Sequence, residues 1–344
     1  MSPSAPDPTL ILQDPSWLAH RYDSDADGIQ FIHAPRAVHR AATFLIDEYL
    51  PEAARPVIVP RAAAMAAAPA PAPLHFIFHS AFCCSTLLAR AFDIEGVAMG
   101  LKEPTILNDL SGWRNRGAAP ASLAAVLDDA MTLLARPFLP GESVIVKPTN
   151  LGNPFAAAML AMRPAARALL LHAPLRLYLG SVAKKGMWGR LWVRELFVKL
   201  GRDGLMDYGF SREEVLRQTD LQIAAIGWLA QHRLFAALIE RHGRDRVRSL
   251  DSEQMLARPQ ETLAALSALF GLALDDAAVA AIVAGDAFTR HSKDGTAFGR
   301  AARQAEQRDA AAVHAEEVDK VAIWAEAVAA SAGQPLQLGA GLLR

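Results

Sequence analysis

The stretch LHFIFHSAFCCSTLLARAFD, residues 74–93, is the most informative part of this chain. Its first residues, Leu74–Phe78, form a short and mostly apolar run that is typical of a buried strand. A loop of small residues follows over His79–Cys84, and an amphipathic helix is predicted to begin at Ser85. A strand that turns directly into a helix presents several backbone N–H groups at one point, where the helix dipole favours negative charge. The stretch therefore predicts an anion-binding loop, to which Ser85 and Thr86 add hydroxyl donors.

Short apolar runs alternate with helical segments beyond this stretch. The predicted strands are Leu74–Phe78, Val97–Leu101, Ser143–Lys147, Ala168–His172 and Arg246–Asp251. The predicted helices between and after them are Ser85–Asp93, Ala121–Arg136, Asn153–Met162, Arg212–His242 and Pro259–Leu269. This order favours an α/β fold, a three-layer sandwich around a mainly parallel five-stranded sheet. Ligands of such sheets bind beyond the carboxyl ends of the strands, so the residues after the strands are expected to converge on one crevice.

The chain is predicted to have three parts. Residues 1–73 form an N-terminal helical region, with a helix over Arg36–Leu50, and a linker rich in alanine and proline. Residues 74–300 form the α/β domain, in which residues 183–210 make a helical insert over the crevice. Residues 301–344 form a helical tail.

Composition limits the partners that we expect. The 35 lysines and arginines nearly balance the 36 aspartates and glutamates, and the net charge of -1 argues against a broad surface for nucleic acid or an anionic membrane. The two cysteines, Cys83 and Cys84, are adjacent and cannot build a disulfide framework, which favours a reducing, cytoplasmic location. We find no signal peptide and no apolar run of about 18 residues that would span a membrane.

No metal is expected from the sequence. The segment Asp23–Gly28, DSDADG, matches the first half of an EF-hand calcium loop, but Ala34 stands where the loop needs its bidentate glutamate. We interpret it as an acidic turn. No cluster of histidine, cysteine and carboxylate side chains has the spacing of a zinc site.

Several of these segments together resemble the sulfotransferases that use 3'-phosphoadenosine 5'-phosphosulfate (PAPS). The family's first loop, K/R-S-G-S/T-T before an apolar pair, is similar to Phe82–Leu88. Its K-S/T-H pattern after a strand is similar to Lys147–Thr149, and its R-x-P loop with a later serine is similar to His172–Pro174 followed by Ser181. The stretch Asp251–Leu274 is similar to a packing signature of the family.

The sequence departs from the family pattern at its basic positions. Phe82 stands at the basic residue of the first loop, and Cys84 stands at its glycine. Thr149 stands at the histidine, and His172 at the arginine of the R-x-P loop. A catalytically silent module that binds a nucleotide or another anion is therefore an alternative. A third hypothesis is a kinase-like transferase that uses ATP. It is disfavoured because the loop lacks the lysine of the GxxxxGK[S/T] motif.

The resemblance implies a fold like that of P-loop nucleoside triphosphate hydrolases, with PAPS as co-substrate and a small-molecule hydroxyl or amine as acceptor. Sulfuryl transfer needs donors around the sulfate, a cation near the bridging oxygen and a base for the acceptor. Glu103 is the predicted base, because it follows a strand into the crevice and the resemblance implies a glutamate there, and His79 is its rival. Lys147 is the predicted cation. The alternative for Glu103 and its neighbour Lys102 is that both are ordinary surface charges.

The resemblance also implies a set of nucleotide-binding residues. We predict that this set comprises Cys83, Cys84, Ser85 and Thr86 for the phosphosulfate, His172, Arg176 and Ser181 for the 3'-phosphate, and Arg290 and Lys293 as basic clamps. Ser181 is expected to cap a helix that begins at Val182. Trp188 and Trp192 lie four residues apart and share a helix face, where they either line an acceptor pocket or pack the insert.

Overall fold

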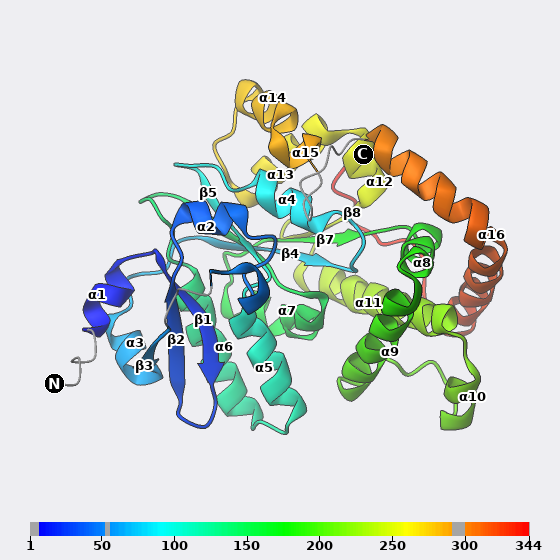
Figure 1. Ribbon diagram of the computed structural model, residues 1–344, viewed down its shortest axis with the longest axis horizontal. Coiled ribbons are helices and arrows are strands. Elements are labelled where there is room, and N and C mark those ends of the chain that lie inside the picture. Colours follow the sequence, from blue (N-terminus) through cyan, green and yellow to red (C-terminus); the bar gives the residue numbers. More distant parts are fainter. Residues whose placement is uncertain (1–6, 52–55, 291–299, 344) are drawn as a thin grey trace. The chain divides into compact units, whose positions relative to one another are not determined.

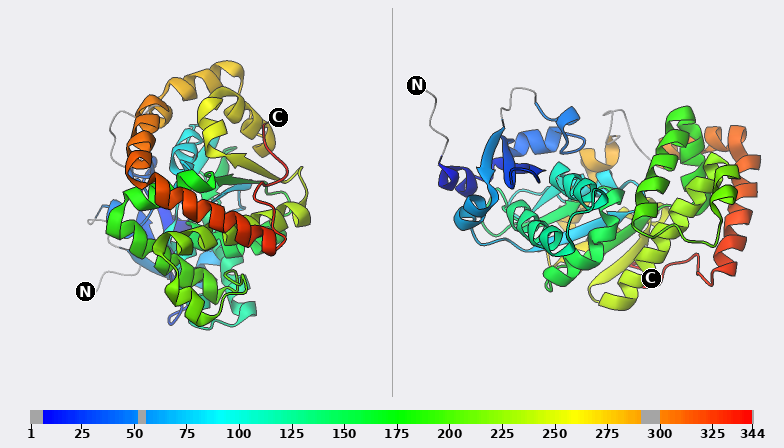
Figure 2. Two further views of the ribbon diagram at one scale, coloured as in Figure 1. Left: turned by 90° about the vertical axis from the view of Figure 1, so that its right-hand side faces the viewer. Right: turned by 90° about the horizontal axis from the view of Figure 1, so that it is seen from below.

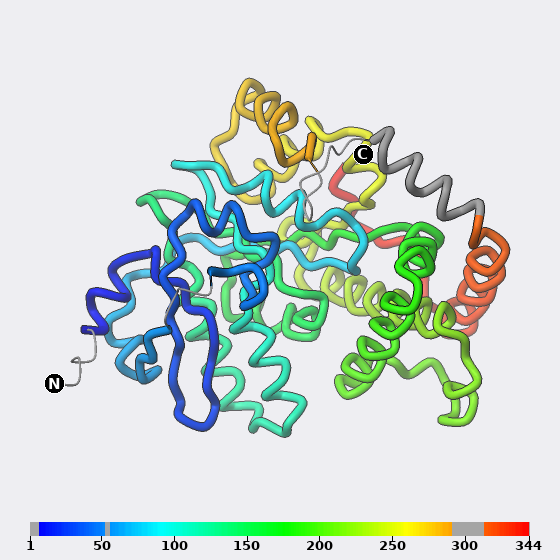
Figure 3. The backbone as a smooth tube through the Cα atoms, in the orientation of Figure 1, coloured from blue at the N-terminus to red at the C-terminus, as the bar shows by residue number. Residues whose placement is uncertain are grey.

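A five-stranded sheet organises the chain (Figure 1). The computed structural model describes residues 7–51, 56–290 and 300–343, and for residues 300–312 it describes the backbone alone (Figure 3). The strands are β4 (Leu74–His79), β5 (Ala98–Lys102), β6 (Ser143–Lys147), β7 (Ala168–His172) and β8 (Val247–Asp251), in the order β5-β6-β4-β7-β8. The pairs β5–β6, β4–β6 and β7–β8 are parallel. The prediction of an α/β fold with a mainly parallel five-stranded sheet is confirmed.

Burial explains why these five segments form strands. Every residue of β4, β5 and β6 is buried, as are the first four residues of β7. Continuous apolar runs of this length suit a parallel sheet that is covered on both faces. Two lysines, Lys102 and Lys147, end β5 and β6 and are buried with them. Buried lysines need partners: Lys102 donates to backbone carbonyls, and Lys147 pairs with a carboxylate.

The chain divides into two compact units. The first comprises residues 1–77, 86–167 and 270–273. Its helices are α1 (Pro8–Gln13), α2 (Arg36–Ala41), α3 (Arg61–Ala67), α4 (Ser85–Ala91, whose first residue is assigned to the second unit), α5 (Thr105–Asn115), α6 (Pro120–Leu134) and α7 (Ala156–Met162), with 3-10 turns at Asp47–Tyr49 and Asn150–Phe155.

Besides α1, α2 and α3, the N-terminal region contains strands that the sequence did not predict. It forms a three-stranded antiparallel sheet of β1 (Trp17–Asp23), β2 (Gly28–His33) and β3 (Val57–Pro60), in that order. The predicted linker also contains β3 and α3. The helix predicted over Arg36–Leu50 ends at Ala41, because tertiary hydrogen bonds replace it: Leu45 N–H donates to the carbonyl of Lys102 at 2.7 Å.

The acidic segment between β1 and β2 is a turn, as predicted. The backbone N–H groups of Asp25 and Ala26 donate to Asp23 Oδ1 at 2.9 and 3.1 Å. Asp27 adopts a left-handed φ of 46°, a conformation that aspartate tolerates better than most residues. The acidic residues thus stabilise the turn that joins the two strands.

The second unit comprises residues 78–85, 168–269 and 274–344. Its helices are α8 (Leu175–Lys184), α9 (Gly186–Arg202), α10 (Arg212–Arg217), α11 (Asp220–His242), α12 (Ser252–Ala257), α13 (Pro259–Phe270, whose last residue is assigned to the first unit), α14 (Asp276–Ala284), α15 (Asp286–Thr289) and α16 (Arg300–Ser331). The C-terminal part of α16, orange to red in Figure 2, lies against α8 and α11.

Two helices of this unit have other bounds than predicted, because local sequence signals set where they begin. The helix predicted over Arg212–His242 is two helices, because Thr219 begins α11 with a capping box and leaves Gln218 extended. The helix predicted to begin at Val182 begins earlier, at Leu175, directly after Pro174. Proline favours a helix start because its φ is already helical and it lacks an N–H that would need a partner.

Candidate functional site

The loop that follows β4, Ser80–Cys84, has a strained backbone. Ala81, Phe82 and Cys84 adopt left-handed φ values of 69°, 52° and 59°. That conformation costs an L-residue about 1–2 kcal/mol, and strain of this kind clusters at functional sites. Cys84 is the residue that stands at the family's glycine, the one residue that takes this conformation without steric cost. Alternation of left- and right-handed residues forms the concave arrays of N–H groups that bind anions.

Neutral contacts within the second unit fix this loop. Ser80 N–H donates to the Leu171 carbonyl at 3.1 Å, and the Cys83 thiol lies 3.5 Å from the same oxygen. Ala81 N–H donates to His79 Nδ1 at 3.1 Å. An Nδ1 that accepts this bond carries no proton, so the structure gives His79 a part in shaping the loop. Its prediction as a rival base remains untested.

Phe82 is the aromatic anchor of the loop. Its ring packs edge-on against Tyr178 of α8 and Trp192 of α9, with centroid distances of 5.8 and 5.4 Å. Trp192 in turn stacks on Trp188, with centroids 6.3 Å apart and planes 10° apart. The prediction that the two tryptophans share one helix face is confirmed. The Phe82 side chain therefore ties α9 to the loop.

Donors without partners stand at the start of α4. Ser85 and Thr86 are each only 6% exposed. Within the described part of the chain, neither their backbone N–H groups nor their hydroxyls make a hydrogen bond. Neither hydroxyl oxygen is fully enclosed, so a ligand could reach both of them. With seven residues, α4 is too short for its dipole to hold an anion alone, so these local donors and the strained loop define the candidate anion site.

In the first unit, the structure brings together Glu103 and Lys147, two of the three predicted catalytic residues. Lys147 Nζ donates to Glu103 Oε1 in an ion pair, and Glu103 N–H donates to the Lys147 carbonyl at 2.7 Å. The Lys147 side chain is fully buried, whereas that of Glu103 is 17% exposed. Lys147 Nζ also lies 5.2 Å from the centroid of the Phe44 ring. The pair presents an ionised carboxylate, backed by a buried cation, at the carboxyl ends of β5 and β6.

The loop after β5, like the loop after β4, has a strained backbone. Glu103 has a left-handed φ of 56°. Of the six non-glycine residues with positive φ in the described part of the chain, four are Ala81, Phe82, Cys84 and Glu103. All four follow strands of the five-stranded sheet directly or by a few residues, at the positions where such sheets bind ligands.

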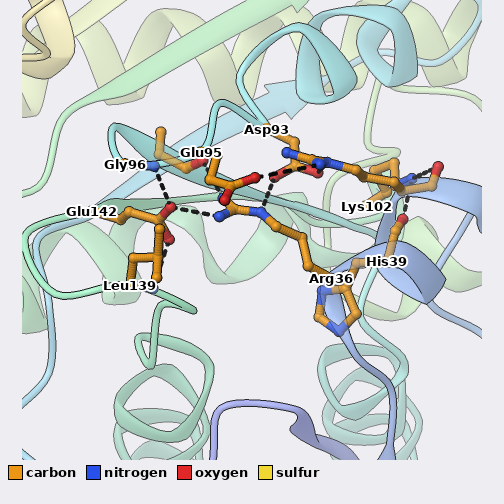
Figure 4. Close-up of polar contacts among 10 residues, drawn as sticks. Arg36, His39, Asp93, Glu95, Gly96, Lys102, Leu139 and Glu142 are labelled. Atoms are coloured by element: carbon orange, nitrogen blue, oxygen red, sulfur yellow. Dashed lines mark hydrogen bonds and ion pairs between the residues drawn. The ribbon is translucent and has the colours of Figure 1, made fainter.

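Lys102 is a buried structural lysine, and its interpretation as a surface charge is wrong. It is 2% exposed, and its Nζ donates to the carbonyls of His39, Arg40 and Ala42 at the end of α2 (Figure 4). Burial lowers the pKa of Lys102 to about 7. A lysine suits this place because the last carbonyls of a helix lack partners within the helix.

A buried charge network near Lys102 was not foreseen from the sequence. Arg36 donates to Asp93 at 3.0 Å and to the fully buried Glu142 at 2.6 Å, and Glu142 also accepts from Gly96 N–H at 2.8 Å (Figure 4). These residues lie 57 and 106 positions from Arg36, so no local pattern could reveal the pairs. The network fastens α2 to the segment before β5 and to the residue before β6.

The residues predicted for the 3'-phosphate do not form one cluster of cations. His172 packs edge-on against His232, whose ring stacks on Trp228, with centroid distances of 4.9 and 3.4 Å. Burial lowers the pKa of His172, an effect that Asp251 opposes. Its imidazole is therefore neutral near pH 7. A role at the phosphate would then rest on a hydrogen bond from the ring.

The other predicted phosphate ligands have partners of their own. Arg176 pairs with Asp319 at 3.1 Å and Glu326 at 2.8 Å, both on α16. Ser181 lies inside α8, and its hydroxyl donates to the Leu177 carbonyl at 2.8 Å, so its prediction as a helix cap is wrong. Arg290 is exposed and pairs with Asp286 at 3.4 Å. Lys293 lies outside the described residues.

Thr149 and Asn108 form a contact that the sequence did not suggest. Thr149, which stands at the family's histidine, donates from its hydroxyl to Asn108 Oδ1 at 2.8 Å. In the described ranges, no group of three or more histidine, cysteine or acidic side chains could hold a metal ion. None of the helices in those ranges is long and apolar enough to cross a membrane.

No protein-family model matches the chain, and no curated protein matches it. Among solved structures, it is similar to the sulfotransferase domain of the Synechococcus PCC 7002 olefin synthase, at 14% identity over 63% of this chain and 79% of that chain, with a TM-score of 0.39. The sulfotransferase domain from the curacin biosynthetic pathway has 12% identity over 66% and 84%, with a TM-score of 0.41. Sulfotransferase STF9 from Mycobacterium avium has 14% identity over 74% and 77%, with a TM-score of 0.40. At these identities and TM-scores, the likeness does not show which reaction this chain performs.

Proposed function

We propose that this chain is a sulfotransferase-like protein that binds PAPS and transfers its sulfuryl group to a hydroxyl or amine of a small-molecule acceptor. One observation carries the proposal: the strained loop after β4 leads into two buried residues at the start of α4, Ser85 and Thr86, whose donors have no hydrogen-bond partner among the described residues. A tetrahedral oxyanion would satisfy these donors at once. The Glu103–Lys147 pair supports the transfer step, because it supplies a base and a cation.

Each group has a distinct part in the proposed reaction. The amides of the β4 loop and the hydroxyls of Ser85 and Thr86 hold the phosphosulfate. Glu103 accepts the proton of the acceptor as its oxygen or nitrogen forms a bond to sulfur. The bond from sulfur to the bridging oxygen breaks, and 3'-phosphoadenosine 5'-phosphate leaves with the electron pair. Lys147 offsets the negative charge that develops on the phosphate, which costs little reorganisation because the lysine is already in place.

The departures from the family pattern favour one alternative, a module that binds the nucleotide without turnover. Phe82 brings no charge to the loop, and the ammonium of Lys147 is already engaged by Glu103. This alternative predicts nucleotide binding, no sulfuryl transfer, and no effect of Glu103→Gln on nucleotide binding. If the chain were instead a kinase-like transferase, it would bind ATP in a magnesium-dependent way.

Calorimetric titration with 3'-phosphoadenosine 5'-phosphate tests the binding half of the proposal. The wild-type chain should bind it, and the double variant Ser85→Ala, Thr86→Ala should bind at least about tenfold more weakly. Ser111→Ala is the matched control, because the Ser111 hydroxyl has partners of its own in the Leu107 and Leu151 carbonyls. No binding up to about millimolar nucleotide would reject the proposal.

Transfer of radiolabelled sulfate from PAPS to a panel of phenols, alcohols and amines tests the catalytic half. Glu103→Gln should abolish transfer and leave nucleotide binding within about twofold, since the amide keeps the shape but not the basicity. Equal transfer by the variant and the wild type would remove Glu103 from the mechanism.

A further inference from the structure

The exposed side of α9 carries four large apolar side chains beside Arg194 and Glu195, although the helix already buries an apolar face. Gly189, Val193, Leu196 and Leu200 are buried within the second unit. On the outside, Met187, Trp188, Leu191 and Val198 are 71%, 60%, 56% and 53% exposed. Those four are among only eleven large apolar side chains that are exposed in the described part of the chain. Large apolar side chains that gather on the outside of a helix often mark an interaction surface.

The charges around the exposed face are mostly positive. Residues 184–202 carry six basic side chains and one acidic side chain, Glu195, in a chain whose net charge is -1. Arg190 and Arg194 are held by carboxylates of the same unit. Lys185 and Arg202, by contrast, form no ion pair within the described residues. The whole-chain charge therefore conceals a local surface that is both apolar and cationic.

We propose that this face of α9 docks onto a membrane surface that contains anionic lipids. Helices that lie in the membrane interface combine tryptophan and aliphatic side chains on one side with lysine and arginine at their edges. Trp188 is the kind of residue that settles at the level of the headgroups. With 17 residues, α9 presents a strip about 25 Å long to a flat surface.

Charge argues for a bilayer over a second copy of the chain. Two copies joined through this face would bring the basic side chains of both helices together, and that repulsion would oppose association. Anionic lipid headgroups attract the same basic side chains, and the apolar side chains can be buried at the boundary between headgroups and acyl chains. The proposal is independent of the PAPS proposal, because it uses neither the β4 loop nor the Glu103–Lys147 pair.

Sedimentation of the full chain with sucrose-loaded vesicles tests this docking. We expect binding to phosphatidylcholine vesicles that contain about one third phosphatidylserine to be at least about tenfold tighter than to phosphatidylcholine alone, and to weaken as salt rises from about 0.05 to 0.5 M. Leu191→Glu should weaken anionic-vesicle binding by about tenfold or more, and Lys185→Glu by about fivefold or more.

Ile323→Glu is the matched control, because Ile323 is likewise 60% exposed but lies on α16. It should leave vesicle binding unchanged, and circular dichroism should show that all variants are folded. Equal sedimentation with neutral and anionic vesicles would overturn the proposal, as would unchanged binding by Leu191→Glu. Analytical ultracentrifugation without lipid is the second readout: a dimer that Leu191→Glu dissociates would show that a second copy covers the face, and would also overturn it.

Discussion

The loop after β4 and the loop after β5 are both strained, but they are held in opposite ways. The β4 loop is fixed by neutral contacts: a carbonyl at Leu171, the imidazole of His79 and the aromatic rings around Phe82. The β5 loop is fixed by charge, through the pair of Glu103 with the buried Lys147. The difference teaches that the unpaired donors and the buried ion pair lie on separate loops, so that a substitution in one loop leaves the contacts of the other intact.

The largest effect is expected from breaking the charged loop. Lys147→Met leaves the Glu103 carboxylate largely buried without its cation, and removal of one partner of such a pair costs about 3–5 kcal/mol in the free energy of unfolding. Urea unfolding at neutral pH measures this. The double variant Lys147→Met, Glu103→Gln should recover much of the loss, because no charge is then left unpaired. A loss below about 1 kcal/mol for the single variant would show that the pair does not hold the loop.

A buried histidine on α2, next to the carbonyls that hold Lys102, should make the first unit sensitive to acid. Burial, with smaller contributions from Lys102 and Arg36, lowers the pKa of His39 from its ordinary value of 6.5 to about 3. The unfolded chain therefore binds a proton that the folded chain refuses, and stability is lost as pH falls from about 6.5 toward 4.

His39→Phe should reduce this loss by about 3 kcal/mol at pH 4, because phenylalanine fills the same space beside Phe138 and cannot be protonated. Urea unfolding of both proteins at a series of pH values checks it. Parallel pH profiles for wild type and variant would contradict the assignment.

A smaller effect, on binding, is expected from adding charge to the neutral loop. Phe82→Arg restores the basic residue of the family pattern and should tighten binding of 3'-phosphoadenosine 5'-phosphate about tenfold, the value of one charge-assisted hydrogen bond. Phe82→Leu removes the same aromatic contacts without adding charge and serves as control. Calorimetry that finds both variants equal would show that charge at this position does not matter.

The smallest effect concerns backbone strain in the neutral loop. Cys84→Gly should stabilise the chain by about 0.5–1 kcal/mol, because glycine relieves the left-handed strain but adds freedom to the unfolded chain. Cys83→Gly is the matched control, and it should destabilise, because Cys83 is buried and its thiol contacts the Leu171 carbonyl. Thermal unfolding of the two variants decides; a lower Tm for Cys84→Gly would refute the strain argument.

The sheet could be predicted from the sequence because its strands are apolar and separated by helices. The bounds of Ser143–Lys147 and Ala168–His172 agree with the structure to the residue. The three-stranded N-terminal sheet was missed, since β1 mixes polar and apolar residues and its pairing with β2 shifts between Ala19 and Arg21. A regular alternation, the usual signal of a half-buried strand, is therefore absent.

The candidate site could be predicted only where its residues follow strands. Glu103 and Lys147 meet because β5 and β6 are parallel neighbours whose last residues pair in register. Contacts that depend on distant helices gave no local signal: Arg176 is held by α16, 143 and 150 positions away. Ser181 was misplaced because Pro174 starts the helix earlier than the serine pattern suggested.

The edge-on contact of Trp192 with Phe82 gives the chain a native optical reporter. Indole emission depends on its immediate surroundings, and here those surroundings include a side chain of the β4 loop itself. A small molecule that reshapes the loop would shift Phe82 against the indole and change the emission intensity. Occupancy could then be followed in real time in the unlabelled protein, with Trp192→Phe as the silent reference.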